Sequence, residues 1–341
     1  MCCPLKTRWL APMSLLALAA CTTNQPTGGV GKPESTATAP AAPAVEAELQ
    51  PTTWPRFTLQ ADQAWRLNSP EGERFDASGL LFTQSGQLLT INDRGPALYE
   101  IRWAEGQASA DLVLLTNCFT AGQLKPLAAA KTGGRYDCEG IAQDEAGRIY
   151  VCEEADRWIL RWDPNTLTVE RLAIDWSPVK PYFSPTDANA SFEGIAVAHG
   201  RLYVANEREQ GRLIVADLAR LRVVDHFVVR PTHKPKGDVH YSDLCWFDEA
   251  LWVLCRKNQV ILQVDPASHR VLAEFDYRAV ENAPATRYFT LINFGLMEGL
   301  AVDKDHIWLV TDNNGLPHSA NLRDTRPTLF RCPRPDRKRD A

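Results

Sequence analysis

The sequence predicts an all-β fold, and within that class a β-propeller built from four-stranded blades. Three observations carry this prediction. From about residue 54 onward there is no long helical period, and short β-branched and aromatic runs alternate with turn residues. A short motif recurs five times, and a polar residue follows each copy at a constant distance. Such repeats are typical of propeller blades, whereas a β-sandwich would need no repeat.

Each copy of the motif opens a short apolar segment, which is followed by a polar turn and a second apolar segment, as in a β-hairpin. The second position of the motif is glycine in four copies, which lets inner strands crowd a common axis. The five copies are Ser78-Gly79-Leu80-Leu81, Glu139-Gly140-Ile141-Ala142, Glu193-Gly194-Ile195-Ala196, Ser242-Asp243-Leu244-Cys245 and Glu298-Gly299-Leu300-Ala301.

A polar residue stands fourteen positions after the first residue of every copy, where the second strand ends. These residues are Asn92, Glu153, Glu207, Arg256 and Asp312. A third strand follows in every unit and a fourth in most, so the units repeat with a period near 55 residues. We therefore assign residues 54–332 to the propeller.

The ends of this region are expected to close the ring together. The fifth unit lacks a fourth strand after Thr328-Leu329-Phe330, while the orphan segment Arg56-Phe57-Thr58-Leu59 precedes the first unit. We therefore predict that N- and C-terminal strands share one blade. The repeats favour five blades, with six as the alternative if one unit has diverged.

The first twenty residues resemble a secretory signal peptide, with Lys6 and Arg8 before an apolar run too short to span a bilayer. The run ends in Leu18-Ala19-Ala20-Cys21, which resembles the bacterial lipobox, so we expect Cys21 to carry lipid. The alternative is an ordinary signal with a chance cysteine. Thr22 implies sorting to the outer membrane. Residues 21–53 are rich in Pro, Ala and Thr and predict a disordered tether that leaves the propeller in the periplasm.

Charge and cysteine content exclude some functions. The formal net charge is −5, which argues against nucleic acid as a partner, and the basic tail at 333–341 is interpreted as a solvated end. Six cysteines remain after Cys21, an even number that permits disulfides in an oxidising compartment but does not define their pairing. No cysteine spacing indicates a zinc site.

Acidic residues are predicted to meet at one mouth of the central channel. In an antiparallel hairpin, Glu139 would face Glu153, Glu193 would face Glu207, and Glu298 would face Asp312. Opposed like charges destabilise a sheet, so a positive charge is expected beside them. One candidate is a bound cation, calcium or else magnesium, because the ligands on offer are all oxygens. The candidate ligands are Glu139, Glu193, Glu298 and Asp312, with Asn92 and Asn206 nearby.

The other candidates for that positive charge are arginines at the ends of the second strands: Arg94, Arg157, Arg208 and Arg256. The glutamates have a structural alternative as well, in which each accepts backbone N–H groups from a neighbouring blade. Known nucleophile motifs, phosphate loops and dinucleotide fingerprints are absent from the sequence. His233 and His240 lie in a connection between units, and Tyr241-Ser242 would place a hydroxyl at the mouth.

The repeats resemble those of the bacterial propeller families called esterase-like activity of phytase and SdiA-regulated. The resemblance is carried by Asp137-Cys138-Glu139-Gly140-Ile141-Ala142 with Cys152-Glu153-Glu154, by Phe192-Glu193-Gly194 with Asn206-Glu207-Arg208, and by Glu298-Gly299-Leu300-Ala301 with Asp312-Asn313-Asn314. It covers most of residues 75–331 and implies an envelope propeller that binds calcium and hydrolyses esters or phosphoesters. Ser78 and Ser242-Asp243 depart from the pattern, because the glutamate is absent there.

Two functions follow as hypotheses. In the first, calcium at the mouth polarises the ester or phosphoester bond of a small molecule while Arg94, Arg208 and Arg256 hold the anionic oxygens of this substrate. In the second, the propeller is a non-catalytic platform that binds an envelope protein or a glycan, and any metal is structural. In both, the lipid at Cys21 makes the only contact with the membrane.

Overall fold

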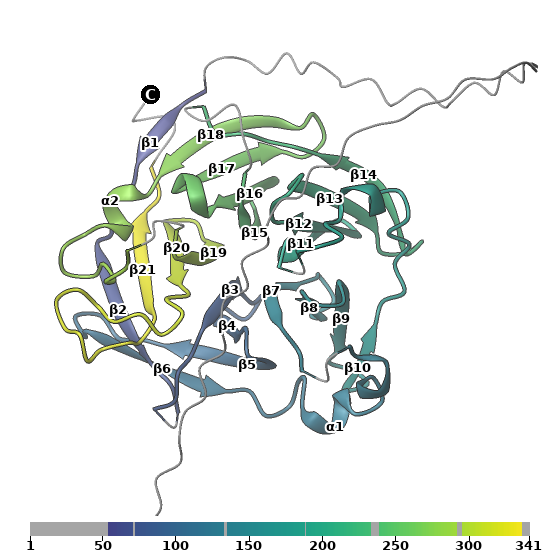
Figure 1. The fold of residues 1–341 in the computed structure, drawn as a ribbon, viewed down its shortest axis with the longest axis horizontal. Coiled ribbons are helices and arrows are strands. Elements are labelled where there is room, and N and C mark those ends of the chain that lie inside the picture. Colours follow the sequence, from purple (N-terminus) through teal and green to yellow (C-terminus); the bar gives the residue numbers. More distant parts are fainter. Residues whose placement is uncertain are drawn as a thin grey trace, which may run out of the picture. The chain divides into compact units, whose positions relative to one another are not determined.

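The computed structural model describes residues 54–70, 72–132, 135–187, 189–232, 239–291 and 295–335, which belong to one compact unit. Their strands form sheets arranged around a central axis (Figure 1). This arrangement confirms the predicted all-β fold. The predicted signal peptide, Cys21, the tether, His233 and the end of the basic tail lie outside the described residues.

In three of the sheets the strands follow one another in chain order, from the innermost strand at the axis to the outermost. The first holds β7 (Cys138–Gln143), β8 (Ile149–Glu153), β9 (Trp158–Asp163) and β10 (Thr168–Arg171). The second holds β11 (Phe192–Ala198), β12 (Arg201–Asn206), β13 (Arg212–Asp217) and β14 (Arg222–Phe227). The third holds β15 (Tyr241–Phe247), β16 (Ala250–Cys255), β17 (Val260–Asp265) and β18 (Arg270–Asp276), with β1 (Arg56–Thr58) outside β18. Each of these three repeats therefore forms its own sheet from local hairpins.

The fourth sheet joins the two ends of the described chain. Its strand order is β19 (Met297–Val302), β20 (His306–Thr311), β21 (Thr328–Pro333), β2 (Gln63–Asn68), β6 (Ser109–Leu114), β5 (Gly95–Arg102), β4 (Leu88–Asn92) and β3 (Ala77–Phe82). Strand β2 is antiparallel to β21 and parallel to β6. N- and C-terminal strands therefore lie side by side, as predicted.

The segment that makes this closure differs from the predicted one. The orphan segment 56–59 was expected to close the ring, but β1 instead pairs in parallel with β18, and β2 lies beside β21. Strand β2 is suited to the interior position because Trp65 and Leu67, which are two positions apart and so lie on the same face of the strand, are fully buried. The Trp65 ring stacks on Trp308 of β20, with ring centroids 5.9 Å apart. This aromatic pair fixes the closing strand in place.

Helices are short. They are α1 (Ala121–Leu124), α2 (Arg278–Glu281) and the single-turn 3₁₀ segments η1 (Ala128–Ala130), η2 (Lys180–Tyr182) and η3 (Arg256–Asn258). None of the helices in the described part of the chain is long and apolar enough to cross a membrane. All six cysteines in the described residues are unpaired, so the disulfides that their even number permitted do not form in this structure.

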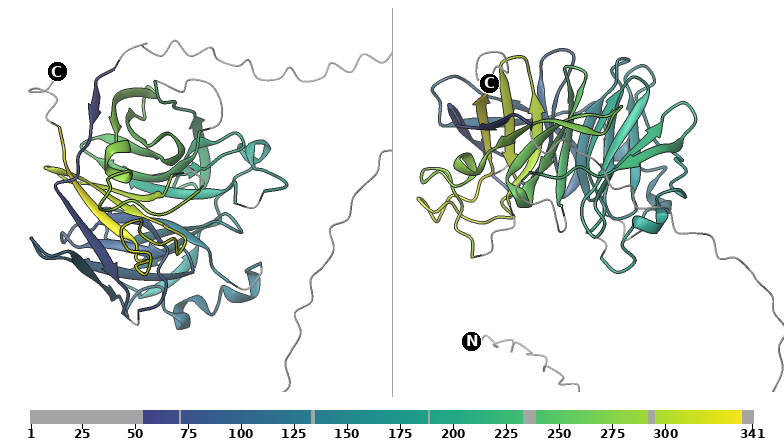
Figure 2. Two further views of the ribbon diagram at one scale, coloured as in Figure 1. Left: turned by 60° about the vertical axis from the view of Figure 1, so that its left-hand side comes forward. Right: turned by 90° about the horizontal axis from the view of Figure 1, so that it is seen from above.

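The innermost strands β3, β7, β11, β15 and β19 contact one another in cyclic order, and β19 contacts β3. Seen edge-on, the strands run between the two ends of the ring (Figure 2). The glycines of the motif allow this crowding: a Cβ added at Gly140 would lie 2.6 Å from the backbone nitrogen of Ile195. Buried aliphatic and aromatic side chains fill the spaces between successive sheets.

Asp243 occupies the motif position that is glycine in the other four repeats. Its Oδ2 accepts hydrogen bonds from the backbone N–H groups of Leu80 at 3.2 Å and Leu300 at 2.7 Å. Its Oδ1 accepts the N–H of Leu244 at 2.8 Å. The carboxyl group therefore joins β3, β15 and β19 at the axis. Together with the close approach of the glycines, this link holds the inner strands near one another around the axis.

Candidate functional site

The acidic residues of the motif lie at β-bulges and do not face their predicted partners directly. In the first pair of inner strands, Cys138 pairs with Glu153 and Ile141 with Val151, which leaves Glu139 within the irregularity. The β11–β12 and β19–β20 pairs have the same irregularity at Glu193 and Glu298. The predicted direct opposition is therefore wrong. A bulge inserts an extra residue on one strand, which shifts the register and turns the side chain toward the mouth.

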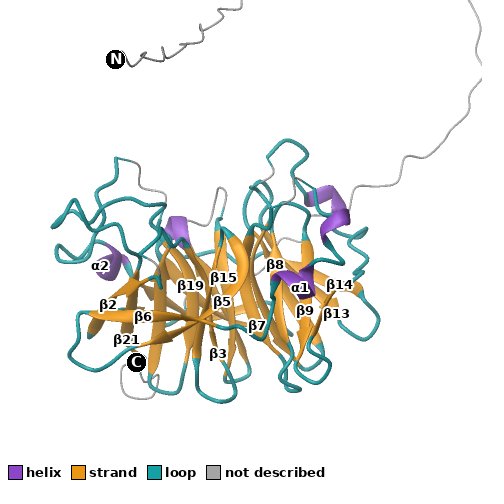
Figure 3. Cartoon of the chain, turned by 90° about the horizontal axis from the view of Figure 1, so that it is seen from below, coloured by secondary structure: helices purple, strands orange, loops and turns teal. Residues whose placement is uncertain are grey.

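We use the name carboxylate mouth for the end of the ring that carries Asp137, Glu139, Glu154, Glu193, Glu298 and Asp312. The long connections between sheets, including the one that carries α2, lie at this end (Figure 3). Short hairpin turns lie at the opposite end. The sequence places the acids here because the motif opens each inner strand.

Asp137, Glu139 and Glu154 form the tightest acidic group at this mouth. Each offers a carboxylate oxygen, and the three oxygens all lie within 4.8 Å of one another. The backbone nitrogen of Glu154 donates to the carbonyl of Asp137 at 2.8 Å, which brings the two strand ends together. Ser78 Oγ donates to Glu139 Oε2 at 2.7 Å, whereas Glu154 Oε1 is buried and has no hydrogen-bond partner among the described residues. The group therefore keeps acceptor capacity that the protein leaves unused.

Burial and mutual repulsion raise the pKa values of these acids. Burial and the charge of Asp137 raise the pKa of Glu154 to about 8. Burial raises the pKa of Glu139 well above its ordinary value, as does the Glu154 charge. Burial also raises that of Glu193, together with the charges of Glu154 and Glu139. The site is thus short of positive charge, and either protons or a cation would relieve it.

A second acidic region continues around the mouth. Burial, followed by the charges of Asp312 and Asp76, raises the pKa of Asp93 to about 7. Burial raises the pKa of Asp312 to about 6, although the N–H of Asn314 donates to its Oδ1 at 2.7 Å. Raised pKa values therefore extend beyond the three-carboxylate group.

The four predicted cation ligands separate into two sets. Glu139 belongs to the three-carboxylate group, and Glu193 interacts electrostatically with that group. Glu298 instead bonds through Oε1 to Arg256, and Asp312 accepts from the backbone and side chain of Asn314. The structure therefore gathers Glu139 and Glu193 and places the other two against different partners.

Arginine supplies positive charge at the mouth, as one of the predictions had it. Arg256 joins Glu207, 2.5 Å from its Nη2, to Glu298. Arg208 also bonds Glu207, and its Nη2 lies 2.9 Å from Asp187. These two guanidinium groups lie close enough to lower the pKa values of Glu154 and Glu193, against the larger effect of burial.

The other two predicted arginines lie apart from this pair. Arg94 Nη1 is 3.4 Å from Asp76. The Arg157 guanidinium packs 4.7 Å from the ring centroid of Phe183 and donates to the carbonyl of Ala190. Of the four predicted arginines, Arg208 and Arg256 are thus the two that act on both Glu154 and Glu193.

Other predicted side chains already have hydrogen-bond or ion-pair partners within the protein. Glu153, the expected partner of Glu139, lies 2.8 Å from the buried ammonium group of Lys131. Ser242 Oγ is buried and donates to the carbonyl of Met297, so it does not provide a hydroxyl at the mouth. His240 Nδ1 lies 3.2 Å from Glu207 Oε1. Among the predicted loop and hydroxyl groups that the structure describes, the His240 ring is the one that contacts Glu207, the glutamate that Arg208 and Arg256 also bind.

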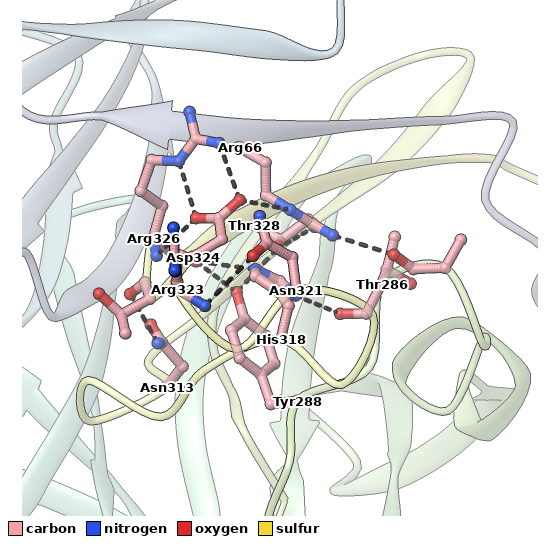
Figure 4. Close-up of polar contacts among 12 residues, drawn as sticks. Arg66, Thr286, Tyr288, Asn313, His318, Asn321, Arg323, Asp324, Arg326 and Thr328 are labelled. Carbon is pink, nitrogen blue, oxygen red and sulfur yellow. Dashed lines mark hydrogen bonds and ion pairs between the residues drawn. The ribbon is translucent and has the colours of Figure 1, made fainter.

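A polar network fixes the long connection that follows Asp312 (Figure 4). Asn313 Nδ2 donates to two carbonyls within the loop, those of Leu316 at 2.7 Å and Thr325 at 2.8 Å. The two ring nitrogens of buried His318 lie 3.0 Å from the carbonyl of Thr286 and 3.1 Å from that of Arg326. This network holds the connection against its neighbour and so positions Asp312 at the mouth.

Sequence reasoning missed Asp137, Glu154 and Asp93 as site residues. A signal was present, because Asp137 stands two positions before Glu139, Glu154 directly follows the fourteen-residue partner Glu153, and Asp93 directly follows Asn92. Attention to the residues flanking each repeat would have included them. Carboxylate oxygens with no sulfur or imidazole ligand suit calcium or magnesium.

Comparisons with known proteins identify one family and several similar solved structures. The family model described as phytase-like, esterase-like activity of phytase, matches residues 76–315. The structure is similar to glutaminyl cyclase from Myxococcus xanthus at 16% identity and a TM-score of 0.53, covering 82% of this chain and 97% of that one. It also matches virginiamycin B lyase from Staphylococcus aureus at 13% identity and a TM-score of 0.38, covering 76% of this chain and 71% of that one. No curated protein matches the sequence.

Proposed function

This chain belongs to the phytase-like family, and from that premise we propose that it is a cation-dependent hydrolase of phosphate esters or other anionic esters. The reaction would take place at the carboxylate mouth. The single observation that carries the proposal is the group of Asp137, Glu139 and Glu154, whose oxygens lie within 4.8 Å of one another while Glu154 Oε1 has no partner.

The residues present fit a hard divalent cation. Three carboxylate oxygens and a buried, unpartnered acceptor make up an oxygen donor set of the kind that calcium binds, and magnesium is the alternative. Asp137, Glu139 and Glu154 would hold the ion, with Glu193 beside them. When bound, such an ion supplies Lewis-acid polarisation of an ester or phosphoryl oxygen.

Arg208 and Arg256 would orient an anionic substrate. Guanidinium groups recognise phosphate and carboxylate oxygens in bidentate fashion, and these two already line the mouth between Glu207 and Glu298. Their bonds to these glutamates hold the donors in place before substrate arrives. Arg94 would bind more distant anionic groups from its position beside Asp76.

Hydrolysis of p-nitrophenyl phosphate and p-nitrophenyl acetate by the mature chain tests the proposal. Activity is expected to vanish after chelation and to return on titration with calcium. Glu154→Gln should lower kcat/KM at least about tenfold, since removing one of the three ligand charges weakens binding of the ion. Glu170→Gln, an exposed carboxylate paired with Arg161, is the matched control. Turnover that persists in EDTA, or that survives Glu154→Gln unchanged, argues against the proposal.

A second candidate function is the non-catalytic platform for an envelope protein or glycan. One observation favours it: Arg256 already links Glu207 and Glu298, so part of the mouth is neutralised by the chain itself. If this candidate is correct, chelation lowers the melting temperature with no hydrolysis under any condition, and a pull-down from solubilised envelope retrieves one specific partner.

We also propose that the protein is a lipoprotein of the bacterial outer membrane, anchored through Cys21, with its propeller in the periplasm. The support is the signal-like order of charge, apolar run and lipobox in residues 1–21. Labelling cells with a palmitate analogue should mark the wild-type protein and leave Cys21→Ser unmarked. Label that persists in Cys21→Ser would contradict the anchor.

We infer five blades, with the eight-stranded sheet counted as two. In this count β3–β6 form the first blade, and β19–β21 with β2 form the fifth. The cyclic contacts of five innermost strands support five over six. An experimental structure with a sixth inner strand would overturn this count.

A further inference from the structure

A second concave site lies at the end of the ring opposite the carboxylate mouth. We call it the hairpin pocket: a cavity of about 350 Å³ lined by the last residues of the inner strands and by the turns that follow them. This volume lies within the range of small-molecule sites. The pocket is lined by the later residues of the inner strands, whereas the motif acids lie where those strands begin, so the pocket and the proposed hydrolase site lie at different ends of the strands.

Aromatic side chains give this pocket its recognition surface. Phe82, Trp246 and Phe247 line it and are only partly buried. Trp246 is held in place from two sides, because its ring stacks on Tyr203 and meets His199 edge-on, each with centroids 5.5 Å apart. The aromatic faces are therefore positioned before any ligand arrives, which reduces the entropy lost on binding.

The charge of the lining is negative. Three carboxylates line the pocket, those of Asp144, Glu145 and Asp303, and no lysine or arginine among the described residues does. Arg148 pairs with Asp144 at 2.6 Å, whereas within the described ranges neither Glu145 nor Asp303 forms an ion pair with lysine or arginine. Burial opposes the ionisation of Asp303, but a hydrogen bond from the Trp308 indole helps keep its pKa below the ordinary value.

An arginine side chain of the protein already lies over one of these rings. The guanidinium of Arg334 lies 5.1 Å from the ring centroid of Phe247, in the range of a cation–π contact, and Arg334 also donates to the carbonyl of Lys304. The rim of the pocket therefore attracts positive charge to an aromatic face within the protein itself.

We propose that the hairpin pocket binds a small organic cation with an apolar body, such as an alkylammonium group. The ammonium group would lie against Trp246 and Phe247 near the carboxylates of Glu145 and Asp303. The apolar body would contact Leu81, Phe82 and Val302. Asp303 has His306 as its ion-pair partner, with 3.5 Å between Oδ1 and Nδ1, and Glu145 accepts the backbone N–H of His199. Aromatic faces combined with carboxylates that no described lysine or arginine neutralises favour such a cation over an anion or a purely apolar molecule. The inference does not depend on the proposed hydrolase activity.

Calorimetric titration of the mature chain with choline and with its neutral isostere 3,3-dimethylbutan-1-ol tests this proposal. The two probes have the same shape and differ in charge. Choline is expected to bind about tenfold more tightly than the alcohol, as a partly desolvated cation–π contact predicts. Equal affinities for the two probes, or no binding of either, would overturn the proposal.

Two variants locate the binding. Trp246→Leu should weaken choline binding at least about tenfold, and Glu145→Gln, an exposed position that tolerates substitution, about threefold. Glu170→Gln is the control carboxylate outside the pocket and should bind choline as wild type does. If choline affinity is unchanged in both pocket variants, the assigned site is wrong. Hydrolase activity at the carboxylate mouth should be the same in Trp246→Leu and wild type.

Discussion

At the residue scale, the Asp243 side chain links three inner strands near the axis. It stands where four repeats have glycine, and backbone N–H groups from three inner strands donate to it. Burial raises its pKa well above the ordinary value, although these N–H groups act in the opposite direction. One substitution in the repeat thus converts a position of close packing into a polar link between strands.

We expect Asp243→Ala to lower the free energy of unfolding by about 2–4 kcal/mol. The change leaves the N–H groups of Leu80 and Leu300 buried without an acceptor, and each orphaned group costs about 1–3 kcal/mol. Urea denaturation followed by circular dichroism measures the effect. Asp243→Asn keeps one carbonyl acceptor and should lose less; equal losses in the two variants would contradict this role.

The raised pKa values at the mouth predict how stability depends on pH. A carboxyl whose pKa is higher in the folded chain takes up protons on folding, so its stabilising contribution is complete below the unfolded value and is lost as pH rises through the folded value. For Glu154 that window runs from 4.5 to about 8, and for Asp93 from 3.8 to about 7. In EDTA, therefore, the free energy of unfolding should fall as pH rises from 5 to 8.

Denaturation at a series of pH values checks this trend. Glu154→Gln should flatten the slope, whereas Glu170→Gln should leave it unchanged. If the site binds calcium, the ion should stabilise the protein more at pH 8 than at pH 5, because protons compete for the same oxygens. A slope of the opposite sign in EDTA would show that other groups dominate.

At the element scale, the connection between β6 and β7 is fixed to β8 by a buried ion pair. The ammonium group of Lys131 lies 2.8 Å from both Glu153 and Asp156, and the side chains of Lys131 and Glu153 are almost completely buried. The ammonium group also lies within 6 Å of the ring centroids of Tyr136 and Trp158. The contact joins a segment with little secondary structure to the second strand of a sheet.

Lys131→Met is expected to destabilise the protein by about 3–5 kcal/mol, because it leaves the Glu153 carboxylate buried without its partner. The double variant Lys131→Met/Glu153→Gln should recover part of this loss, since it removes the unpaired charge. Chemical denaturation of both variants gives the comparison. A double variant that is no more stable than Lys131→Met would exclude this explanation.

At the scale of the whole molecule, the ring is closed by β2 beside β21. Trp65 of β2 is fully buried and stacks on Trp308 of β20. The closure links two segments more than 200 residues apart, so the stability of the first and last sheets depends on it.

Trp65→Ala should therefore cost about 3–5 kcal/mol, the usual range for emptying a large buried aromatic site. Because the lost contacts are those of β2, where the ring closes, limited proteolysis should cleave the residues around β2 and β21 first. Val224→Ala, at an exposed position on β14, is the control and should change stability by less than about 0.5 kcal/mol. Uniform cleavage of the Trp65→Ala variant around the ring would contradict a local role.

The sequence by itself determined the all-β class, the repeated hairpins and the end of each inner strand at which the acids lie. These features are local: hydrophobic alternation, turn residues and a fixed spacing within each unit express them directly. Only the tertiary structure decided that bulges turn Glu139, Glu193 and Glu298 away from their expected partners, and that Glu139 meets Glu154 while Glu298 meets Arg256. The Glu298–Arg256 pair depends on how separate sheets pack around the axis, whereas Glu139 meets Glu154 because a bulge shifts the register within one hairpin. The constant spacing along the chain expresses neither the sheet packing nor the bulge.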